Sequence, residues 1–208
     1  MTASDLALAD RIIDIGREMH TLGYVAANDG NISARCSDGN ILVTPTGVSK
    51  GSLSRDMLIK VTLSGDIVEG NRRPSSETKM HLRLYAENPG INAVTHAHPA
   101  AATSFAIAGI ALDRPIYPEA LVTLGTVPVA PYATPGTQEV PDSIAPFAKT
   151  HKALLLAHHG VLSWGRDLTE AWYRMESVEN YARITMNVYY ILKAPRELSQ
   201  NDIDKLGL

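Results

Sequence analysis

The chain has 208 residues, of which 45% are hydrophobic and 20% charged, a composition typical of a globular domain and not of a disordered or fibrous chain. Lysine and arginine total 19 and aspartate and glutamate total 22, so the formal net charge of -3 argues against general binding to nucleic acid or to a membrane surface. The single Cys36 cannot form an internal disulfide, and no segment reaches the roughly 18 to 20 apolar residues of a membrane span, so we expect a cytoplasmic protein with one domain over 1–208.

The first third of the chain predicts one long helix followed by short strands. Apolar residues recur at helical spacing over 5–22, with Ser4 as the expected N-cap. Two short runs at 31–35 and 41–44 flank an Asp-Gly turn and therefore predict a β-hairpin. Another short apolar run follows at 58–63.

Prolines mark the boundaries of two helices in the middle of the chain. A helix is expected after Pro74, and it must stop before Pro89 because the residue before a proline disfavours the α region. Residues 91–98 predict a strand. Pro99 then begins a second helix that runs to about residue 108.

The last third predicts further strands at 126–130 and 153–157 and a long amphipathic helix over 167–192. Ser199 and Asp202 resemble a capping box for a short final helix. Strands and helices intermix without strict βαβ alternation. This favours an α/β fold of the α+β type, an α/β/α sandwich around a central, mostly antiparallel sheet.

The sharpest chemical feature is the pair His96 and His98 inside a predicted strand. Residues two apart on a strand point to the same face, so both imidazoles can chelate one metal ion, and the later sequence 158–160 (His-His-Gly) offers a third. Three histidines with an open position are typical of a catalytic zinc site. The alternative is a pair of half-exposed strand histidines without a ligand. His20 and His81 lie on predicted helices and are expected to be surface or packing residues.

A second feature is the sequence Ser75-Ser76-Glu77 at a predicted helix start. Two hydroxyls beside free amide donors form a ready anion site, and a carboxylate there could act as a general acid and base. The alternative is simple helix capping, with an acidic residue that favours the helix dipole.

Two turn sequences, 28–31 (Asn-Asp-Gly-Asn) and 44–47 (Thr-Pro-Thr-Gly), form the third feature. Gly30 and Gly47 would let backbone N–H groups reach a phosphate, although turn chemistry alone also explains them. Neither segment is a Walker loop or a dinucleotide fingerprint, which argues against a nucleotide as the main ligand.

In chain order these motifs resemble the class II aldolase/epimerase family, whose members include fuculose-1-phosphate aldolase, ribulose-5-phosphate 4-epimerase, methylthioribulose-1-phosphate dehydratase and the adducin head domain. The resemblance covers nearly the whole chain. It extends to Tyr117 and to residues 131–137, which are most like fuculose-1-phosphate aldolase. Asn28 departs from that enzyme, which has a threonine there.

The resemblance implies that His96, His98 and His159 hold Zn²⁺, or Mn²⁺, Co²⁺ or another divalent ion, and that Glu77 is the catalytic carboxylate and can also touch the metal. It implies that Tyr117 acts from the adjacent subunit of a homotetramer whose active site lies at the subunit interface. The pocket that it implies for the substrate phosphate consists of Asn28, Gly30, Asn31, Thr46, Gly47, Ser75 and Ser76.

The reaction implied is reversible cleavage of a (deoxy)ketose 1-phosphate, such as L-fuculose 1-phosphate or a 5-deoxypentulose 1-phosphate, into dihydroxyacetone phosphate and a short aldehyde. Glu77 favours an aldolase over the resembling epimerases, which carry aspartate, and Ser76 favours it over the resembling dehydratases, which commonly carry alanine before the acid. A sugar-phosphate 4-epimerase, a methylthioribulose-1-phosphate dehydratase and a non-catalytic interaction domain of the adducin-head type stay open as alternatives.

Overall fold

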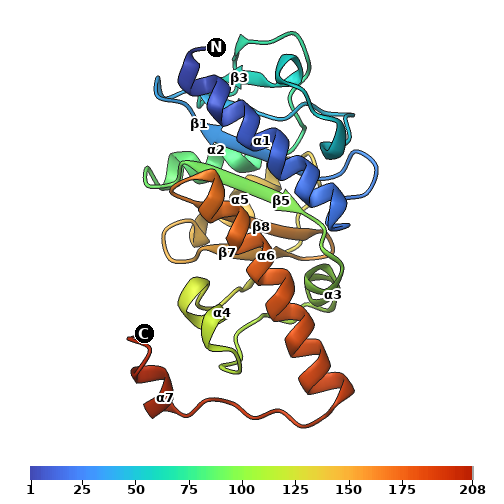
Figure 1. Ribbon diagram of the computed structural model, residues 1–208, viewed down its shortest axis with the longest axis vertical. Helices are drawn as coiled ribbons and strands as arrows, with labels where there is room; N and C mark the ends of the chain where they lie inside the picture. The colour runs from blue at the N-terminus through green and yellow to red at the C-terminus, as the bar shows by residue number, and fades with distance from the viewer. Residues whose placement is uncertain (208) are drawn as a thin grey trace.

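Eight strands form one sheet in the order β4-β3-β2-β1-β5-β8-β7-β6 in the computed structural model, which describes residues 1–207 (Figure 1). Neighbouring strands are antiparallel, except that β6 and β7 are parallel. The strands are β1 (Asn31–Arg35), β2 (Ile41–Val43), β3 (Ile59–Val61), β4 (Ile67–Glu69), β5 (Ala93–Ala97), β6 (Val129–Ala130), β7 (Ala153–Leu156) and β8 (Gly160–Gly165). The expected mostly antiparallel sheet is therefore confirmed.

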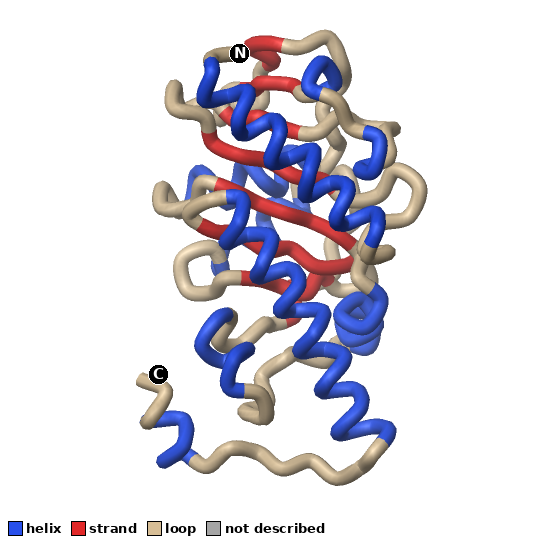
Figure 2. The backbone as a smooth tube through the Cα atoms, in the orientation of Figure 1, coloured by secondary structure: helices blue, strands red, loops and turns tan. Residues whose placement is uncertain are grey.

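Helices cover both faces of this sheet. In Figures 1 and 2, α1 and α6 cross the near face, while α2 and α5 lie behind it. The α-helices are α1 (Ala3–Thr21), α2 (Thr78–Glu87), α3 (Ala100–Ala108), α4 (Pro118–Thr123), α5 (Glu139–Ile144), α6 (Leu168–Thr185) and α7 (Gln200–Asp204). Short 3-10 turns are η1 (Lys50–Ser52), η2 (Arg55–Met57) and η3 (Ala145–Phe147), and η4 (Met186–Ile191) is a π-helical turn.

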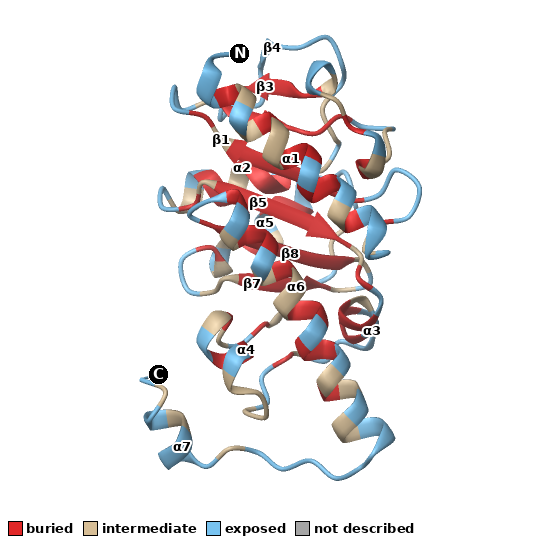
Figure 3. Cartoon of the chain, in the orientation of Figure 1, coloured by how far each residue is buried: buried red, intermediate tan, exposed pale blue. Residues whose placement is uncertain are grey.

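Two apolar layers hold the sandwich together, and Figure 3 shows most of the strands between them as buried, whereas the edge strand β4 is exposed. Ile12 and Met19 of α1 and Trp172 of α6 pack on one face of the sheet. Met80 of α2 and Ile144 of α5 pack on the other. Within residues 1–207, none of the helices combines the length and the apolar character that a bilayer crossing requires.

The first helix begins earlier than its sequence predicts. Thr2, not Ser4, is the N-cap of α1: its hydroxyl accepts a hydrogen bond from the Asp5 backbone N–H, and the Asp5 carboxylate accepts one from the Thr2 N–H. This reciprocal capping box satisfies two backbone donors, which a cap at Ser4 would leave unpaired. The prediction of Ser4 as the cap was therefore wrong. By contrast, Ser199 caps α7 as expected.

The structure adds one strand that was not predicted and corrects two expectations. Strand β8 was not predicted, although its six residues are all buried. Strand β5 ends at Ala97, so His98 follows the strand and is not inside it. The α-helical part of the long helix ends at Thr185, and the chain continues as the π-helical turn η4 and not as α-helix to residue 192.

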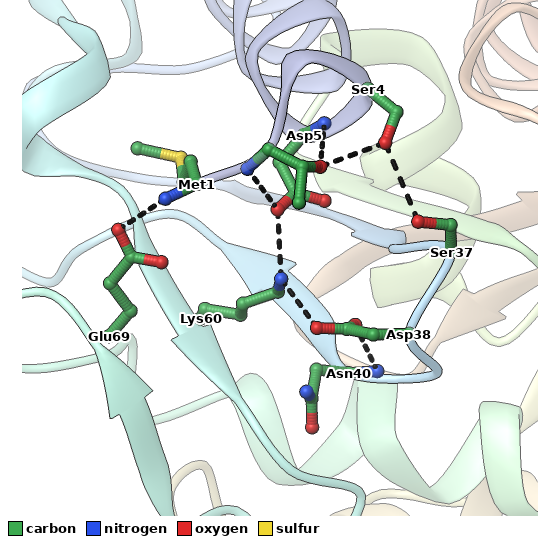
Figure 4. Close-up of polar contacts among 9 residues, drawn as sticks. Met1, Ser4, Asp5, Ser37, Asp38, Asn40, Lys60 and Glu69 are labelled. Atoms are coloured by element: carbon green, nitrogen blue, oxygen red, sulfur yellow. Dashed lines mark hydrogen bonds and ion pairs between the residues drawn. The ribbon is translucent and has the colours of Figure 1, made fainter.

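A cluster of charged side chains around the buried Lys60 attaches the start of α1 to strand β3 and to the β1–β2 turn (Figure 4). The Lys60 Nζ lies 2.8 Å from an Asp5 carboxylate oxygen and 2.7 Å from one of Asp38. The side chains of Lys60 and Asp5 are only 6% and 1% exposed, whereas that of Asp38 is 47% exposed. The N-terminal ammonium of Met1 adds an ion pair with Glu69. Lys60 thus joins β3, helix α1 and the β1–β2 turn.

The Asp5→Ala variant should lower the free energy of unfolding by about 3 kcal/mol, because it leaves a buried ammonium with one half-exposed partner. The matched Asp38→Ala variant should cost less than about 1 kcal/mol. The hydrogen bond from Lys60 lowers the pKa of Asp5, so this stabilisation is present above the pKa of an unfolded aspartate and is lost as the pH falls through the lowered value. Denaturant unfolding of both variants at neutral and acidic pH checks this, and equal losses would contradict it.

Candidate active site

Three imidazoles converge at the carboxyl end of β5. The ligand atoms of His96, His98 and His159 all lie within 4.8 Å of one another. The Nε2 atoms of His96 and His98 are 3.1 Å apart, and Glu77 places its two carboxylate oxygens 3.4 Å from His96 Nε2 and 3.1 Å from His159 Nε2. Tetrahedral zinc ligands at about 2.0–2.1 Å lie about 3.3–3.4 Å from each other. The three histidines and Glu77 therefore lie close enough to one another to be ligands of one divalent ion.

The outer nitrogens of two of these rings are held by neighbouring acceptors. His96 is fully buried on β5, and its Nδ1 lies 2.8 Å from the Val161 carbonyl oxygen on the adjacent β8. His98 Nδ1 lies 3.5 Å from an Asp29 carboxylate oxygen. An acceptor at Nδ1 puts the proton there and leaves the Nε2 lone pair free for a metal, an arrangement that metal-binding histidines commonly show.

The β7–β8 turn brings His159 to the other two rings. His158 carries the left-handed strain of this turn, with φ of 57°, and its ring stacks edge-on with Tyr132 instead of joining the cluster. A Cβ on Gly160 would lie 2.5 Å from His98 Cδ2 and 2.6 Å from the Ala97 carbonyl oxygen. Glycine is therefore needed at 160 for close approach.

Electrostatics favour the protonation states that metal binding requires. Burial lowers the pKa of His96 to about 3, and burial also lowers the pKa of His98, so both rings are neutral near pH 7. Burial alone would raise the pKa of Glu77, but His96, a hydrogen bond with His159 and another with Asn31 lower it below its usual range. The site therefore presents His96 and His98 as neutral imidazoles and Glu77 as an ionised carboxylate, which suit a divalent cation.

Glu77 belongs to a polar stripe between α2 and β1. Its Oε2 accepts a hydrogen bond of 2.6 Å from Asn31 Nδ2. One turn along α2, the buried His81 shares a hydrogen bond of 2.7 Å with Ser33, whose hydroxyl also lies 2.8 Å from the Tyr85 hydroxyl. Residues four apart on the helix thus meet residues two apart on the strand, which fixes how Glu77 points into the site. His81 is accordingly a buried packing residue, one of the two roles expected for it.

A cavity of about 230 Å³ opens beside the histidines. Two of its wall-forming loops turn at Gly30 and Gly47, whose φ angles of 73° and 72° lie in the left-handed region that favours glycine. The Thr46 N–H bonds to the Arg73 carbonyl, which pairs the second loop with the segment before α2. The described lining residues are Asn28, Asp29, Gly30, Asn31, Pro45, Thr46, Gly47, Ser75, Ser76, Glu77, His98 and His159.

The structure therefore brings together all residues expected in the phosphate pocket, and it places them next to the histidine cluster. Tyr117 is not among the described residues that line this cavity. It is the N-cap residue of α4, and its hydroxyl lies 3.3 Å from Asn180 Nδ2 on α6. Sequence reasoning missed the role of Asp29 beside His98, because it treated this residue only as part of a turn.

Several known proteins are similar to this chain over most of its length. Residues 10–186 match the family described as Class II Aldolase and Adducin N-terminal domain. The 3-oxo-tetronate 4-phosphate decarboxylase of Haemophilus influenzae is 34% identical over 189 residues, which cover 87% of this chain and 88% of that protein. An L-fuculose phosphate aldolase of Escherichia coli is 36% identical over 200 residues, which cover 94% and 90%. Among solved structures, YgbL of Klebsiella pneumoniae superposes with a TM-score of 0.91 at 31% identity, and the match covers 99% of this chain and 100% of that chain. YgbL is described as “a putative aldolase/epimerase/decarboxylase”.

Proposed function

The chain belongs to the family of class II aldolases and adducin N-terminal domains, and from this premise we propose that it is a divalent-metal-dependent lyase that breaks a carbon–carbon bond in a short phosphorylated sugar. The observation that carries the proposal is the set of three imidazoles and one carboxylate around a common centre, directly beside a cavity lined by serine hydroxyls and glycine loops.

The residues present fit a divalent ion, since three imidazole nitrogens and one carboxylate are pre-arranged and two of the rings have acceptors at Nδ1. A bound Zn²⁺, Mn²⁺ or Co²⁺ ion would act as a Lewis acid that stabilises the negative charge developing on the substrate's ketone and hydroxyl oxygens. The ligands would be His96, His98 and His159, with Glu77 at the fourth position until substrate binds.

The first candidate reaction is the cleavage of a ketose 1-phosphate into dihydroxyacetone phosphate and a short aldehyde. The C3–C4 bond breaks, its electron pair stays on C3, and the hydroxyl on C4 loses its proton as the aldehyde forms. Glu77, held by Asn31, carries the proton to C3. Ser75, Ser76, Thr46 and the glycine loops bind the phosphate and so fix the orientation of the reacting carbons.

A second candidate, decarboxylation of a 3-oxo sugar acid phosphate, is supported by the Haemophilus influenzae relative. Loss of carbon dioxide leaves an electron pair on the carbon next to the ketone, and Glu77 would protonate that carbon as in the first reaction. The cavity favours the aldolase, because its described lining includes two carboxylates and no lysine or arginine. A sugar acid would bring a second anionic group into it, whereas an aldehyde is neutral.

One substrate panel distinguishes the reactions. The metal-loaded protein is incubated with L-fuculose 1-phosphate, a 5-deoxypentulose 1-phosphate, ribulose 5-phosphate, methylthioribulose 1-phosphate and 3-oxo-tetronate 4-phosphate. Dihydroxyacetone phosphate together with an aldehyde supports the aldolase, and together with carbon dioxide it supports the decarboxylase. An epimer, or loss of water, without carbon–carbon cleavage would replace the proposal with an epimerase or a dehydratase. No conversion of any substrate by metal-loaded protein would favour the non-catalytic interaction domain.

We further propose that Tyr117 completes the site of an adjacent subunit in a homotetramer, where it would exchange the proton of the C4 hydroxyl. Its place at the start of α4, outside the cavity of its own chain, supports this.

Mixing Tyr117→Phe subunits with Glu77→Gln subunits should then restore activity that neither variant has alone. At equal amounts, about one quarter of the sites would combine an intact Glu77 with an intact Tyr117, since each is present with a probability of about one half. The measurement is turnover after joint refolding, and the control is mixing without subunit exchange. Absence of recovery would place Tyr117 in a role within its own subunit.

A further inference from the structure

Lys50 is a buried cation whose role the site described above does not explain. It begins η1 and is 1% exposed. Its Nζ donates hydrogen bonds to the carbonyl oxygens of Asn28, at 2.9 Å, and Val48, at 2.7 Å. An ammonium group inside a protein is costly unless its charge is compensated, and two neutral carbonyls compensate it only in part.

The two carbonyls belong to the two loops that border the candidate phosphate cavity. Asn28 begins the loop of Gly30, and Val48 directly follows Gly47. One ammonium group therefore ties both loops together from behind the cavity wall. The Asn28 and Val48 carbonyl oxygens share this ammonium group as their donor, so its removal would release the link between the two loops.

The charges around the cavity make this position significant. Its described lining includes the carboxylates of Asp29 and Glu77 and no cationic side chain, although the proposed substrate carries a phosphate dianion. Both carboxylates act on Lys50 and favour its charged form, while burial lowers the pKa of Lys50 to about 8. The ammonium is thus electrostatically coupled to the groups of the cavity and is still charged near neutral pH.

Close packing keeps Lys50 in place. A Cβ on Gly16 of α1 would lie 2.5 Å from the Lys50 carbonyl oxygen, and a Cβ on Gly51 would lie 2.8 Å from the His20 ring. Helix α1 and η1 therefore approach each other at two glycines, and the backbone of Lys50 cannot move toward the helix.

We propose that Lys50 is a positioning residue that determines specificity for a phosphorylated substrate: its buried ammonium joins the two loops of the cavity and supplies the positive charge that a phosphate group needs there. This inference rests on the proposed function. The inference adds Lys50 to the proposed function as a residue that does not touch the reacting atoms and acts through the backbone of the two loops.

The test uses inorganic phosphate as the probe, so that it does not depend on knowing the substrate. Calorimetric titration of the full-length protein should give a dissociation constant about tenfold to hundredfold higher for Lys50→Gln than for the wild type, since a hydrogen-bonded charge contributes on this scale. Lys50→Arg, which keeps the charge and the donors, should recover most of the affinity. The control Lys79→Gln removes an equal charge from the exposed face of α2 and should change the affinity less than about twofold.

Turnover gives a second readout once a substrate is known. For Lys50→Gln the KM should rise with the phosphate dissociation constant, while kcat stays within about threefold of the wild type. If Lys50 had a purely structural role, Lys50→Gln would lower kcat and the free energy of unfolding, and Lys50→Arg would lose phosphate affinity as well.

Two results would overturn the inference, and they differ in what else they affect. If the wild type and Lys50→Gln bind phosphate equally, or if the glutamine and arginine variants lose equal affinity, Lys50 has no charge-specific role and the proposed function stands. If the wild type binds no phosphate at millimolar concentration, the phosphate pocket itself is wrong and this inference falls with it. If Lys50→Gln does not fold, phosphate binding by the metal-free wild type is measured as a function of pH instead. The affinity should fall as the pH rises above about 8 and Lys50 loses its proton. An affinity that stays constant to pH 10 would overturn the inference.

Discussion

A Glu77→Gln protein should still bind metal through its three histidines and still bind phosphate, and yet turn over about 10³-fold more slowly, because positioned proton transfer contributes about 10²–10⁴ to such reactions. Glutamine has the shape of glutamate and can still accept the hydrogen bond that Asn31 Nδ2 donates over 2.6 Å. It cannot carry the proton to the carbon from which the aldehyde or carbon dioxide leaves. The measurement is kcat beside metal content and phosphate affinity.

Two control variants separate proton transfer from other effects. Glu77→Asp keeps a carboxylate one methylene further away and should retain part of the activity. Glu87→Gln makes the same chemical change at the other end of α2, where the side chain pairs with Arg83 far from the histidines, and should leave turnover unchanged. Unchanged turnover in Glu77→Gln would remove this residue as the proton carrier.

The parts of the fold that follow from local sequence were predicted well. The periodic apolar residues of α1, α2 and α6 mark one buried face each, and the prolines mark where α2 ends and α3 begins. The grouping of the phosphate loops with the histidines was predicted from resemblance to a family. The spacing of His96 and His98 alone was compatible both with a metal site and with two half-exposed strand histidines that bind no ligand.

Other features depend on tertiary structure and leave no local signal. Strand β8 is buried on both faces, so its sequence lacks the alternation that identifies a half-exposed strand. The helices α4 and α5 have six residues each, too short to show a period. Lys50 and Asp29 look like ordinary turn residues in the sequence. Only the folded structure shows that Lys50 is buried and that Asp29 lies close to His98.

Removal of the divalent ion should abolish carbon–carbon cleavage, with a loss of about 10³-fold or more, since a metal ion stabilises developing charge by several kcal/mol. A chelator followed by dialysis should yield inactive but folded protein, because the fold is held by two apolar layers on either side of the sheet and not by the metal site. Return of Zn²⁺, Mn²⁺ or Co²⁺ should restore activity. Retained activity after complete removal of the ion would contradict the proposed function.

A graded set of histidine-site variants tests the same centre through metal affinity, without using turnover. His98→Ala removes one of three converging nitrogens and should weaken binding more than about 100-fold, beyond what the loss of an outer partner costs. Asp29→Asn, which weakens only the acceptor at His98 Nδ1, should cost about tenfold. His158→Asn should cost nothing, because this ring faces Tyr132 and asparagine tolerates its left-handed backbone. Direct titration with Co²⁺ or Zn²⁺ measures the series, and equal affinities for His98→Ala and the wild type would show that the three rings do not share an ion.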